Sequence, residues 1–501
     1  MRILLLYPYY PETFWGFQYA LKFISKKASS PPLGLLTVAA MLPRDWELRL
    51  IDLNVQRLKA EDLEWADYVF ISGMAIQRDS ARQVIARCKQ IKKPVVAGGP
   101  LFTTEYDNFP EVDHFVLGEA EEIMDQLVED LEKRNLKPFY RASRFPDLTR
   151  SPIPRWDLVD QRKYAVMCVQ YSRGCPFNCE FCDITVLNGP RPRTKTREQM
   201  IAELDALYRW GWRDSVFIVD DNFIGNKRKL KQEVLPAIAE WMRAHRYPFT
   251  FSTQLSIDLA DDEELMELMV RAGFQTVFVG IETPHEESLY ECSKYQNIHR
   301  DLLESVKKIQ SHGLETQGGF ILGFDHDPPT IFDRLIEFIQ ESRIVAAMVG
   351  LLNAPRGSRL YQRLVKENRL IKSTSGDNTD FTLNFIPKMN WKVLLDGYKR
   401  VLSTIYSPAQ YYDRLKDFLA NFSPPRLRPP YLRFHHIKAF LRSIWHLGIL
   451  GEERFHYWRL FLWSLFKKPF SFPSMLSFAI QGYHFRRIFS KYIRNLTSPF
   501  A

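Results

Sequence analysis

Three cysteines on one short loop carry the clearest chemical signal in the sequence. Cys175, Cys179 and Cys182 form a C-x3-C-x2-C pattern within the stretch Tyr171–Asp183. A [4Fe–4S] cube has four irons, so three thiolates on one loop can hold it and leave one iron open to another ligand. Structural zinc is the main alternative, but zinc usually takes paired C-x2-C or Cys/His elements and needs a fourth ligand. No Cys or His follows Cys182 until His245, which favours the iron–sulfur cluster.

This loop resembles the radical SAM superfamily, whose hallmark is the same spacing with an aromatic residue, here Phe181, before the last cysteine. The resemblance implies that S-adenosylmethionine (SAM) chelates the open iron and is split to a carbon radical by an electron from the cluster. The other cysteines, Cys88, Cys168 and Cys292, are expected to be small buried hydrophobes. With six cysteines in 501 residues and no signal-peptide pattern at the start, we expect a reducing, cytoplasmic setting.

The elements around the loop predict a partial TIM-type barrel of the (β/α)6 kind. Six apolar, strand-like runs alternate with helical stretches, and the first run leads directly into the cysteine loop. The runs are Val166–Gln170, Ser215–Val219, Phe249–Thr253, Thr276–Val279, Gln317–Leu322 and Ala347–Leu352. The active site of such a barrel is expected at the carboxyl ends of its strands.

Polar residues gather at those predicted strand ends. The candidate SAM-binding residues are Asp220, Asp221, Asn222, Ser252, Gln254 and Glu282. Each could instead cap a helix or form a turn, which is the more frequent role of Asp and Asn at such places. Because several of these residues are expected on one face of the barrel, we favour SAM binding over helix capping. The superfamily resemblance implies that the run 220–222 lies where the amino group of SAM is bound, and that Glu282 lies where its ribose or carboxylate is contacted.

A doubly wound, Rossmann-like α/β domain is predicted before the barrel. Apolar runs at 2–7, 47–51, 68–71, 94–97 and 114–117 alternate with helical stretches. The candidate cofactor-binding residues at the ends of these runs are Ser72, Gly73, Gly98, Gly99, Gly118 and Glu119. Glycine at these ends lets a backbone approach a ligand closely, although tight turns without a ligand give the same pattern.

Beside the cysteine loop, this domain resembles the cobalamin-binding module that precedes the radical SAM domain in one large subgroup. The matching stretches are Pro31–Leu35, Asp52–Asn54 and Ala97–Pro100. Better-known cobalamin folds carry D-x-H-x-x-G, with the histidine on cobalt, whereas Asn54 and Arg57 stand here in place of His and Gly. The resemblance therefore implies cobalamin as a cofactor, bound without a histidine from this motif.

The whole chain resembles the hopanoid C-2 methylase group of these class B radical SAM methylases. The closer match lies in Pro11–Trp15, Pro31–Leu42 and Cys182–Thr185. It implies a radical SAM C-methyltransferase in which a 5′-deoxyadenosyl radical removes hydrogen from an unactivated carbon and a methyl group passes from SAM through cobalamin to the substrate. The expected partners are a hydrophobic, polycyclic or lipid-like small molecule and an electron donor such as flavodoxin or ferredoxin.

Three other functions share features with this sequence. A cobalamin-dependent radical SAM cyclase or rearrangement enzyme stays open as the nearest alternative. A tRNA methylthiotransferase-like enzyme is disfavoured, because such enzymes need three further N-terminal cysteines and only Cys88 precedes residue 146. An iron–sulfur electron carrier would fill all four iron positions with protein ligands and would not need a barrel.

The C-terminal part is predicted to be helical, basic and rich in aromatic residues. Residues 421–501 hold thirteen Lys and Arg against two Glu, a net charge of +11 in a chain whose total is +9. The aromatic residues interleaved with these bases include Trp445, Tyr457, Trp458, Phe461, Trp463 and Phe466. This pattern suits best a helical cap on the barrel with a solvated basic face, next a peripheral contact with the inner face of a membrane, and least well a nucleic acid. No apolar run reaches the roughly 20 residues of a membrane span.

Composition divides the chain into four parts. We expect a cobalamin-binding domain at 1–145, a Pro-rich linker at 146–164, a radical SAM barrel at 165–388 and a helical domain at 389–501.

Overall fold

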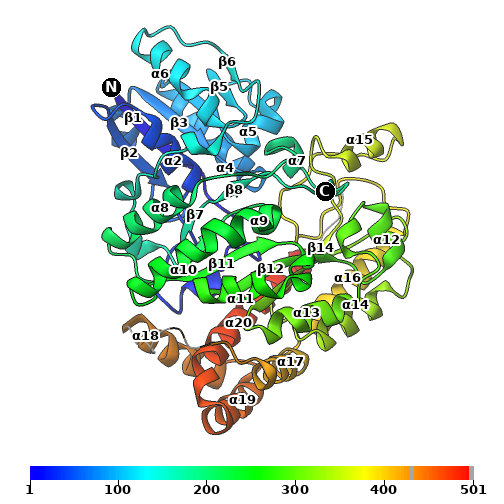
Figure 1. Cartoon of the computed structure of the whole chain (residues 1–501). Coiled ribbons are helices and arrows are strands. Elements are labelled where there is room, and N and C mark those ends of the chain that lie inside the picture. The colour runs from blue at the N-terminus through cyan, green and yellow to red at the C-terminus, as the bar shows by residue number, and fades with distance from the viewer. Residues whose placement is uncertain (426, 428–433, 496–501) are drawn as a thin grey trace.

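The computed structural model describes residues 1–425, 427 and 434–495 and contains two six-stranded parallel sheets and a C-terminal group of helices (Figure 1). This arrangement confirms the predicted α/β fold class with a mainly helical C-terminal region. The stretch 428–433, which includes part of the predicted basic and aromatic tail, lies outside the described residues.

The first sheet has the strand order β2-β1-β3-β4-β5-β6, and all its strands are parallel. Its strands are β1 (Arg2–Tyr7), β2 (Glu47–Asp52), β3 (Tyr68–Ser72), β4 (Val95–Gly98), β5 (His114–Leu117) and β6 (Phe139–Arg141). Its helices are α2 (Leu33–Met41), α3 (Ala60–Trp65), α4 (Arg78–Gln90), α5 (Pro100–Glu105) and α6 (Met124–Glu132). Five of the strands were predicted; β6 was not.

Both faces of this sheet are buried, which explains its continuous apolar runs. Leu4 and Leu6 of β1 pack into one core cluster, whereas Ile3 and Leu5 pack into the cluster that continues into the barrel. The strand order reverses between β1 and β3, so a crevice opens at their carboxyl ends, where α/β sheets bind ligands.

The second sheet forms the partial barrel, in the order β14-β13-β12-β11-β10-β7. Its strands are β7 (Met167–Val169), β10 (Ser215–Ile218), β11 (Thr250–Leu255), β12 (Phe274–Glu282), β13 (Glu315–Leu322) and β14 (Ala347–Leu351). All six were predicted, and all pair in parallel. The helices between them are α8 (Arg197–Arg209), α10 (Leu235–Ala244), α11 (Glu263–Ala272), α13 (Leu302–Ser311) and α14 (Ile331–Glu341). Because β7 and β14 are the two edges of this sheet, the barrel is open on one side.

The N-terminal segment 8–32 lies along the β7 side of that opening. The backbone N–H groups of Ala165 and Val166 donate to the carbonyl of Ser29 at 3.1 and 2.9 Å. Trp15 of the same segment reaches into the barrel, where its ring meets the ring of Phe278 edge-on at 5.3 Å. This segment therefore belongs to the barrel wall as well as to the first domain.

Helix α20 (Phe472–Asn495) fills the rest of the opening and runs behind the strands (Figure 1). Phe485 of α20 stacks on Phe14 with ring centroids 4.2 Å apart, and His484 donates from Nε2 to the Phe14 carbonyl at 2.9 Å. On the β14 side, the Tyr406 hydroxyl donates to the Ala347 carbonyl at 2.7 Å, and its ring also contacts Phe485. The last described helix thus completes the barrel.

Three C-terminal helices gather at the amino-terminal end of the barrel strands (Figure 1). They are α17 (Pro408–Asn421), α18 (Phe434–Ser443), which continues into π-helical turns at Ile444–Ile449, and α19 (Arg454–Lys467). Helix α16 (Trp391–Ile405) packs beside α14, whereas α15 (Arg359–Lys366) lies beside the cysteine loop, where the Leu360 backbone N–H donates to the Glu180 carbonyl at 2.8 Å. Arg343, just before β14, pairs with Asp417 of α17 at 2.5 Å. The interpretation of this region as a helical cap on the barrel is therefore confirmed.

Not all tail aromatics face outward. Tyr457 is fully buried, and Trp458, Phe461 and Trp463 pack against the core, so these four rings contribute to the packing of the cap, as the cap interpretation expects. Trp445 and Phe466 are exposed. Across residues 1–425, 427 and 434–495, we find no helix with the length and apolar character that a membrane span requires.

Candidate functional site

The cysteine loop leaves β7 and is anchored from the end of the next strand, β10. Asp220 is buried and accepts hydrogen bonds from the backbone N–H of Tyr171 (2.8 Å) and from the N–H (2.7 Å) and hydroxyl (2.5 Å) of Ser172. Burial raises the pKa of Asp220 to about 7, against the opposing effect of these donors. Asp220 therefore positions the start of the loop.

Asp221 and Asn222 continue this support. Asp221 accepts from the backbone N–H of Gly174 at 3.0 Å and from Asn188 Nδ2 at 2.9 Å, which ties the two ends of the loop together. Asn222 is buried, and its Nδ2 donates to the Ser256 hydroxyl at 3.2 Å. All three polar residues predicted after the second barrel strand thus lie at the base of the cysteine loop.

The three cysteines are close neighbours on this loop. Cys179 is buried, whereas Cys175 and Cys182 are partly exposed. Burial raises the pKa of the Cys175 and Cys182 thiols, and their negatively charged neighbours add to the increase. No group of three or more His, Cys, Asp or Glu among the described residues could hold a single metal ion. A [4Fe–4S] cube offers a separate iron to each thiolate, so its ligands need not converge on one point.

Glu282, at the carboxyl end of β12, faces the cysteine loop. Its carboxylate pairs with Lys294 at 2.7 Å, and both side chains are buried. Burial alone would lower the pKa of Lys294, but the Glu282 carboxylate and the Cys179 thiolate raise it. Gln296 Nε2 approaches Cys179 Sγ at 3.9 Å. A cation and an amide donor therefore stand beside the sulfur of Cys179.

The backbone at Glu282 is strained. Its φ is +66°, in the left-handed region that bulky residues seldom adopt, at a break in the β12–β13 register. Asn297 Nδ2 holds this conformation by donating to the carbonyls of Gly280 and Ile281 at 3.2 and 3.0 Å.

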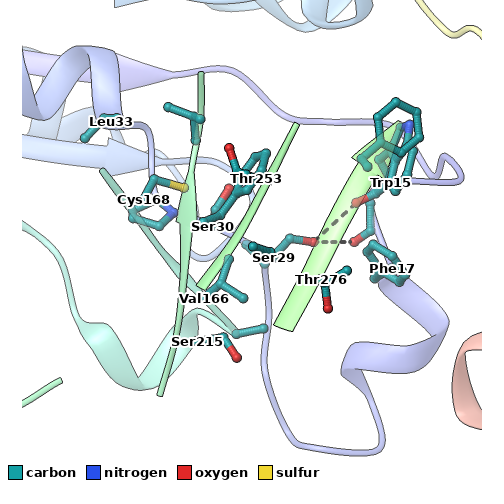
Figure 2. Close-up of a pocket in the computed structure, with 18 of the residues that line it drawn as sticks. Trp15, Phe17, Ser29, Ser30, Leu33, Val166, Cys168, Ser215, Thr253 and Thr276 are labelled. Atoms are coloured by element: carbon teal, nitrogen blue, oxygen red, sulfur yellow. Dashed lines mark hydrogen bonds between the residues drawn. The ribbon is translucent and has the colours of Figure 1, made fainter. Parts of the chain in front are cut away.

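A cavity of about 2450 Å³ fills the barrel and reaches the first domain. From the barrel strands, its lining includes Cys168, Ser252, Gln254, Phe278, Gln317 and Met348. Figure 2 shows Trp15, Phe17 and Ser29 of the segment 8–32 around the same space as Cys168, Ser215 and Thr276 of the strands. The cavity exceeds the roughly 300–1,000 Å³ of an ordinary small-molecule pocket, so it can hold more than one ligand.

The predicted strand-end residues of the first domain line this same cavity. They are Ser72, Gly73, Gly98, Gly99, Gly118 and Glu119. Gly99 and Gly118 have φ of +89° and +96°, and a Cβ on Gly99 would lie 2.4 Å from the Ser72 hydroxyl. These positions present bare backbone to the cavity, as a large flat ligand requires.

Two polar residues of the first domain, Glu119 and Asn54, already have protein partners. The Glu119 carboxylate pairs with Arg173 at 2.7 Å and with Arg193 at 2.5 Å, so it links the first domain to the cysteine loop. Asn54 lines the cavity, but its Oδ1 accepts from the backbone N–H of Tyr10 at 2.7 Å.

The donor sets fit the implied cofactors. Three thiols on one anchored loop suit an iron–sulfur cube. Arg173, which precedes the first of these cysteines, lines the cavity together with the glycine-containing strand ends of the first domain. Sequence reasoning missed Arg173, Lys294, Gln296 and Phe278. Arg173 stands inside the cysteine motif, so its position was a usable signal; the other three become neighbours of the site only through the fold.

Comparison with known proteins supports this combination of domains in one chain. Family models match as "B12 binding domain" over residues 24–128, as "Radical SAM superfamily" over 169–339 and as a domain of unknown function, DUF4070, over 358–498. An uncharacterized methyltransferase of Synechocystis sp. is 41% identical over 97% of this chain and 91% of its own length. The hopanoid C-2 methylase of Rhodopseudomonas palustris is 36% identical over 93% of this chain and 90% of its own length.

Solved structures with the same fold include the cobalamin-dependent radical enzyme OxsB with aqua-cobalamin bound. It has a TM-score of 0.63 and 13% identity, covering 99% of this chain and 80% of that one. The methyltransferase TsrM from Kitasatospora setae, with cobalamin and a [4Fe–4S] cluster bound, has a TM-score of 0.59 and 15% identity, covering 97% and 99%.

Fold and site together define a radical SAM enzyme with a cobalamin-binding domain. Its cofactors are a [4Fe–4S] cluster, SAM and cobalamin. The chain belongs to the cobalamin-dependent radical SAM methyltransferase family.

Proposed function

We propose that this methyltransferase adds a methyl group to an unactivated carbon of a hydrophobic, polycyclic or lipid-like molecule. The observation that carries the proposal is the group of large apolar side chains inside the barrel, where Trp15, Phe278 and Met348 border the cavity. Burial of apolar surface against such side chains favours an apolar ligand. Because a relative with 36% identity is a hopanoid C-2 methylase, a hopanoid is the first candidate.

In this proposal the chain's own residues hold and position the cofactors. Cys175, Cys179 and Cys182 hold the cluster, and Asp220 and Asp221 position their loop. When bound, the cluster and SAM supply the carbon radical, and cobalamin carries the methyl group.

Ser252 and Gln254 line the cavity and are proposed to contact SAM. Gly73, Gly98, Gly99 and Gly118 are proposed to support cobalamin through their backbone. The segment 8–32 and α20, which complete the barrel wall, are proposed to shield the sides of the space in which the radical forms.

The enzyme also needs a reductant. We propose a one-electron donor such as flavodoxin or ferredoxin, a cytoplasmic setting, and the division into domains at 1–145, 165–388 and 389–501 around a linker at 146–164.

The test uses anaerobically reconstituted full-length protein with hydroxocobalamin, a chemical reductant and SAM carrying a CD3 group. Incubation with a solubilised hopanoid should give a product heavier by one CD3 in place of one hydrogen, detected by mass spectrometry. Replacing all three cluster cysteines by Ala should abolish both this product and 5′-deoxyadenosine.

A cavity-filling variant provides the matched control. Met348→Trp should lower methylation at least tenfold while 5′-deoxyadenosine still forms in the absence of substrate. A product isomeric with the hopanoid would favour the cyclase or rearrangement alternative. Absence of the labelled product, with SAM still cleaved, would contradict a hopanoid as the substrate.

A further inference from the structure

An apolar surface stands outward on the helices that cap the amino-terminal end of the barrel. Ile437, Leu441, Trp445 and Ile449 recur every fourth residue along α18 and the π-helical turns, and each is at least 42% exposed. Phe455 and Phe466 of α19 are 75% and 76% exposed. We call these six residues the tail surface. Six large apolar side chains exposed on two neighbouring helices mark a docking site rather than scattered exposure.

The helices that carry the tail surface have mostly positive charge, although Asp413 of the neighbouring α17 is also exposed and lies 3.8 Å from Arg459 of α19. Lys438, Arg454 and Lys467 are exposed on the same helices. Of the two acidic residues in 434–495, Glu453 is buried and paired with Arg486 at 2.5 Å, which leaves Glu452 as the one exposed acid in that range. Exposed rings beside cations complement an anionic lipid surface, where rings enter the acyl boundary and cations meet phosphate.

The cavity reaches the molecular surface at the same place. Ile437 and Phe470 line the cavity and are 42% and 70% exposed. Between them and the barrel interior, the lining continues through Ser477 and Gln481 of α20 to Gln317 of β13. A continuous space therefore joins the tail surface to the barrel interior, at the end of the strands opposite the cysteine loop.

The cavity also reaches the surface near the first domain, where Tyr9 and Met74 line it and are both 47% exposed. That end lies at the crevice proposed for cobalamin. The two ends thus differ in character: one adjoins the cofactor sites, and the other adjoins an apolar and basic surface.

We propose that the tail surface docks on an anionic membrane and that an apolar substrate passes from the bilayer into the barrel through the amino-terminal end of its strands. The inference deepens the proposed function, because it presupposes an apolar substrate. It gives the two ends of the barrel separate uses, with the cofactors on one side and the substrate entrance on the other.

Docking is tested by sedimentation with vesicles of phosphatidylcholine and phosphatidylglycerol. The triple variant Trp445→Ser, Phe455→Ser, Phe466→Ser should lower the fraction bound at least tenfold. The matched control replaces exposed apolar residues elsewhere, as Tyr295→Ser, Val365→Ser, Ile386→Ser, and should bind like the original protein. Circular dichroism checks that both variants are folded.

The dependence of binding on salt concentration distinguishes a membrane partner from a nucleic-acid partner. Vesicle binding should weaken but persist at high salt, because ring burial does not depend on salt. Binding to single-stranded DNA would fall as a power of the salt concentration. Equal sedimentation of the triple variant and its control, or tighter binding to DNA than to vesicles at low salt, would overturn the docking surface.

Entry is tested with a photoreactive apolar lipid placed in the same vesicles, with cross-linked peptides identified by mass spectrometry. Label should appear at the tail surface and on the inner strands that carry Phe278 and Gln317. Ser477→Trp, which places a ring in the cavity near its tail end, should reduce the inner label at least fivefold without changing vesicle binding. Ser490→Trp, on the same helix outside the cavity lining, is the matched control.

Inner label that survives in Ser477→Trp, or label concentrated at Tyr9 and Met74, would overturn the entrance. Because neither assay measures methyl transfer, their failure is distinct from failure of the proposed reaction. Conversely, methylation of a detergent-solubilised substrate without vesicle binding would support the function and reject the docking.

Discussion

At the scale of single residues, Asp220 and Asp221 direct their carboxylates to the backbone of the cysteine loop. Acceptors buried beneath a loop fix its path, because each buried N–H that loses its partner costs about 1–3 kcal/mol. Asp220 receives two such N–H groups and one hydroxyl. The path of the loop therefore depends on residues some forty positions further along the chain.

Asp220→Ala should lower the free energy of unfolding by about 2–6 kcal/mol, since two buried N–H groups lose their acceptor. Iron content after reconstitution should fall with it. The measurements are denaturant unfolding of the apoprotein and iron analysis. Asp396→Ala, at an exposed position with a side chain 76% accessible, should change neither. Full iron content in Asp220→Ala would show that the loop holds its shape without this anchor.

Gly99 offers a second test at this scale. Its φ of +89° with ψ of −176° belongs to a region open to glycine alone, so Gly99→Ala should cost about 1–3 kcal/mol. Uptake of hydroxocobalamin, followed by absorbance, should weaken as well. Gly34→Ala in α2, where an added Cβ meets nothing within 4 Å, should instead stabilise the protein by roughly 0.5–1 kcal/mol. Unchanged stability in Gly99→Ala would contradict the strain argument.

At the scale of elements, Arg173 joins the cysteine loop to the first domain. Its guanidinium lies between Glu119 and Glu121, at 2.7 and 2.9 Å, and all three side chains are largely buried. Removing one partner of a buried ion pair leaves an uncompensated charge, which costs about 3–5 kcal/mol.

Arg173→Met should therefore destabilise the protein by that amount and lower both iron and cobalamin content, because the loop and the strand ends lose their common partner. Thermal melting and cofactor analysis measure this. Arg356→Met breaks the more exposed pair with Asp107 and should cost less than about 1 kcal/mol. Equal effects of the two substitutions would argue against a special role of Arg173.

The contact between α20 and the segment 8–32 should depend on pH. Burial lowers the pKa of His484 to about 4 from its ordinary 6.5, against the opposing pull of the Phe14 carbonyl. Between pH 4 and 6.5 the unfolded chain binds a proton at His484 that the folded chain does not. Stability is thus lost as the pH falls through this window, by up to about 3 kcal/mol.

Denaturant unfolding at pH 4.5, 5.5 and 7.5 should show this loss in the original protein. In His484→Gln the pH dependence should be smaller by the contribution of that one group. His299→Gln, at an exposed histidine, should retain the original profile. Identical profiles for His484→Gln and the original protein would exclude His484 as the source.

At the scale of the whole molecule, the C-terminal helices are part of the barrel. A chain ending at Ser423 lacks α20, and with it the stacking of Phe485 on Phe14 and the tilted ring contact of Phe485 with Tyr406. We expect such a truncated chain to be insoluble or to lose its near-ultraviolet circular dichroism. A soluble, cooperatively unfolding product would show that the barrel closes without α20. Membrane binding must therefore be tested with point substitutions.

Much of the fold could be predicted because buried parallel strands leave continuous apolar runs, as at Arg2–Tyr7 and Ser215–Ile218. Strand β6 was missed because its three residues, Phe139–Arg141, form no such run. The position of Asp220 at a strand end was also predictable, but the direction of its side chain was not. A polar residue at a strand end can bind a ligand or a neighbouring loop, and only the folded structure shows which of the two it binds.

The closure of the barrel by α20 could not be predicted, because no local pattern in the sequence indicates it. His484 and Phe14 meet across 470 positions, and neither residue type indicates its partner. For a related reason, the sequence could not show which aromatic residues of the tail are buried and which are exposed. In α19 rings occur on every side of the helix, so periodicity alone could not separate buried Tyr457 from exposed Phe466.

The long separation in the chain between the segment 8–32 and α20 has a consequence for synthesis in the cell. A ribosome that adds about 5–20 residues per second needs roughly half a minute or more to reach α20 after the segment 8–32 has emerged. Throughout that time the nascent barrel has an open, apolar side that a chaperone can bind. We therefore expect the barrel to close only after α20 has emerged from the ribosome.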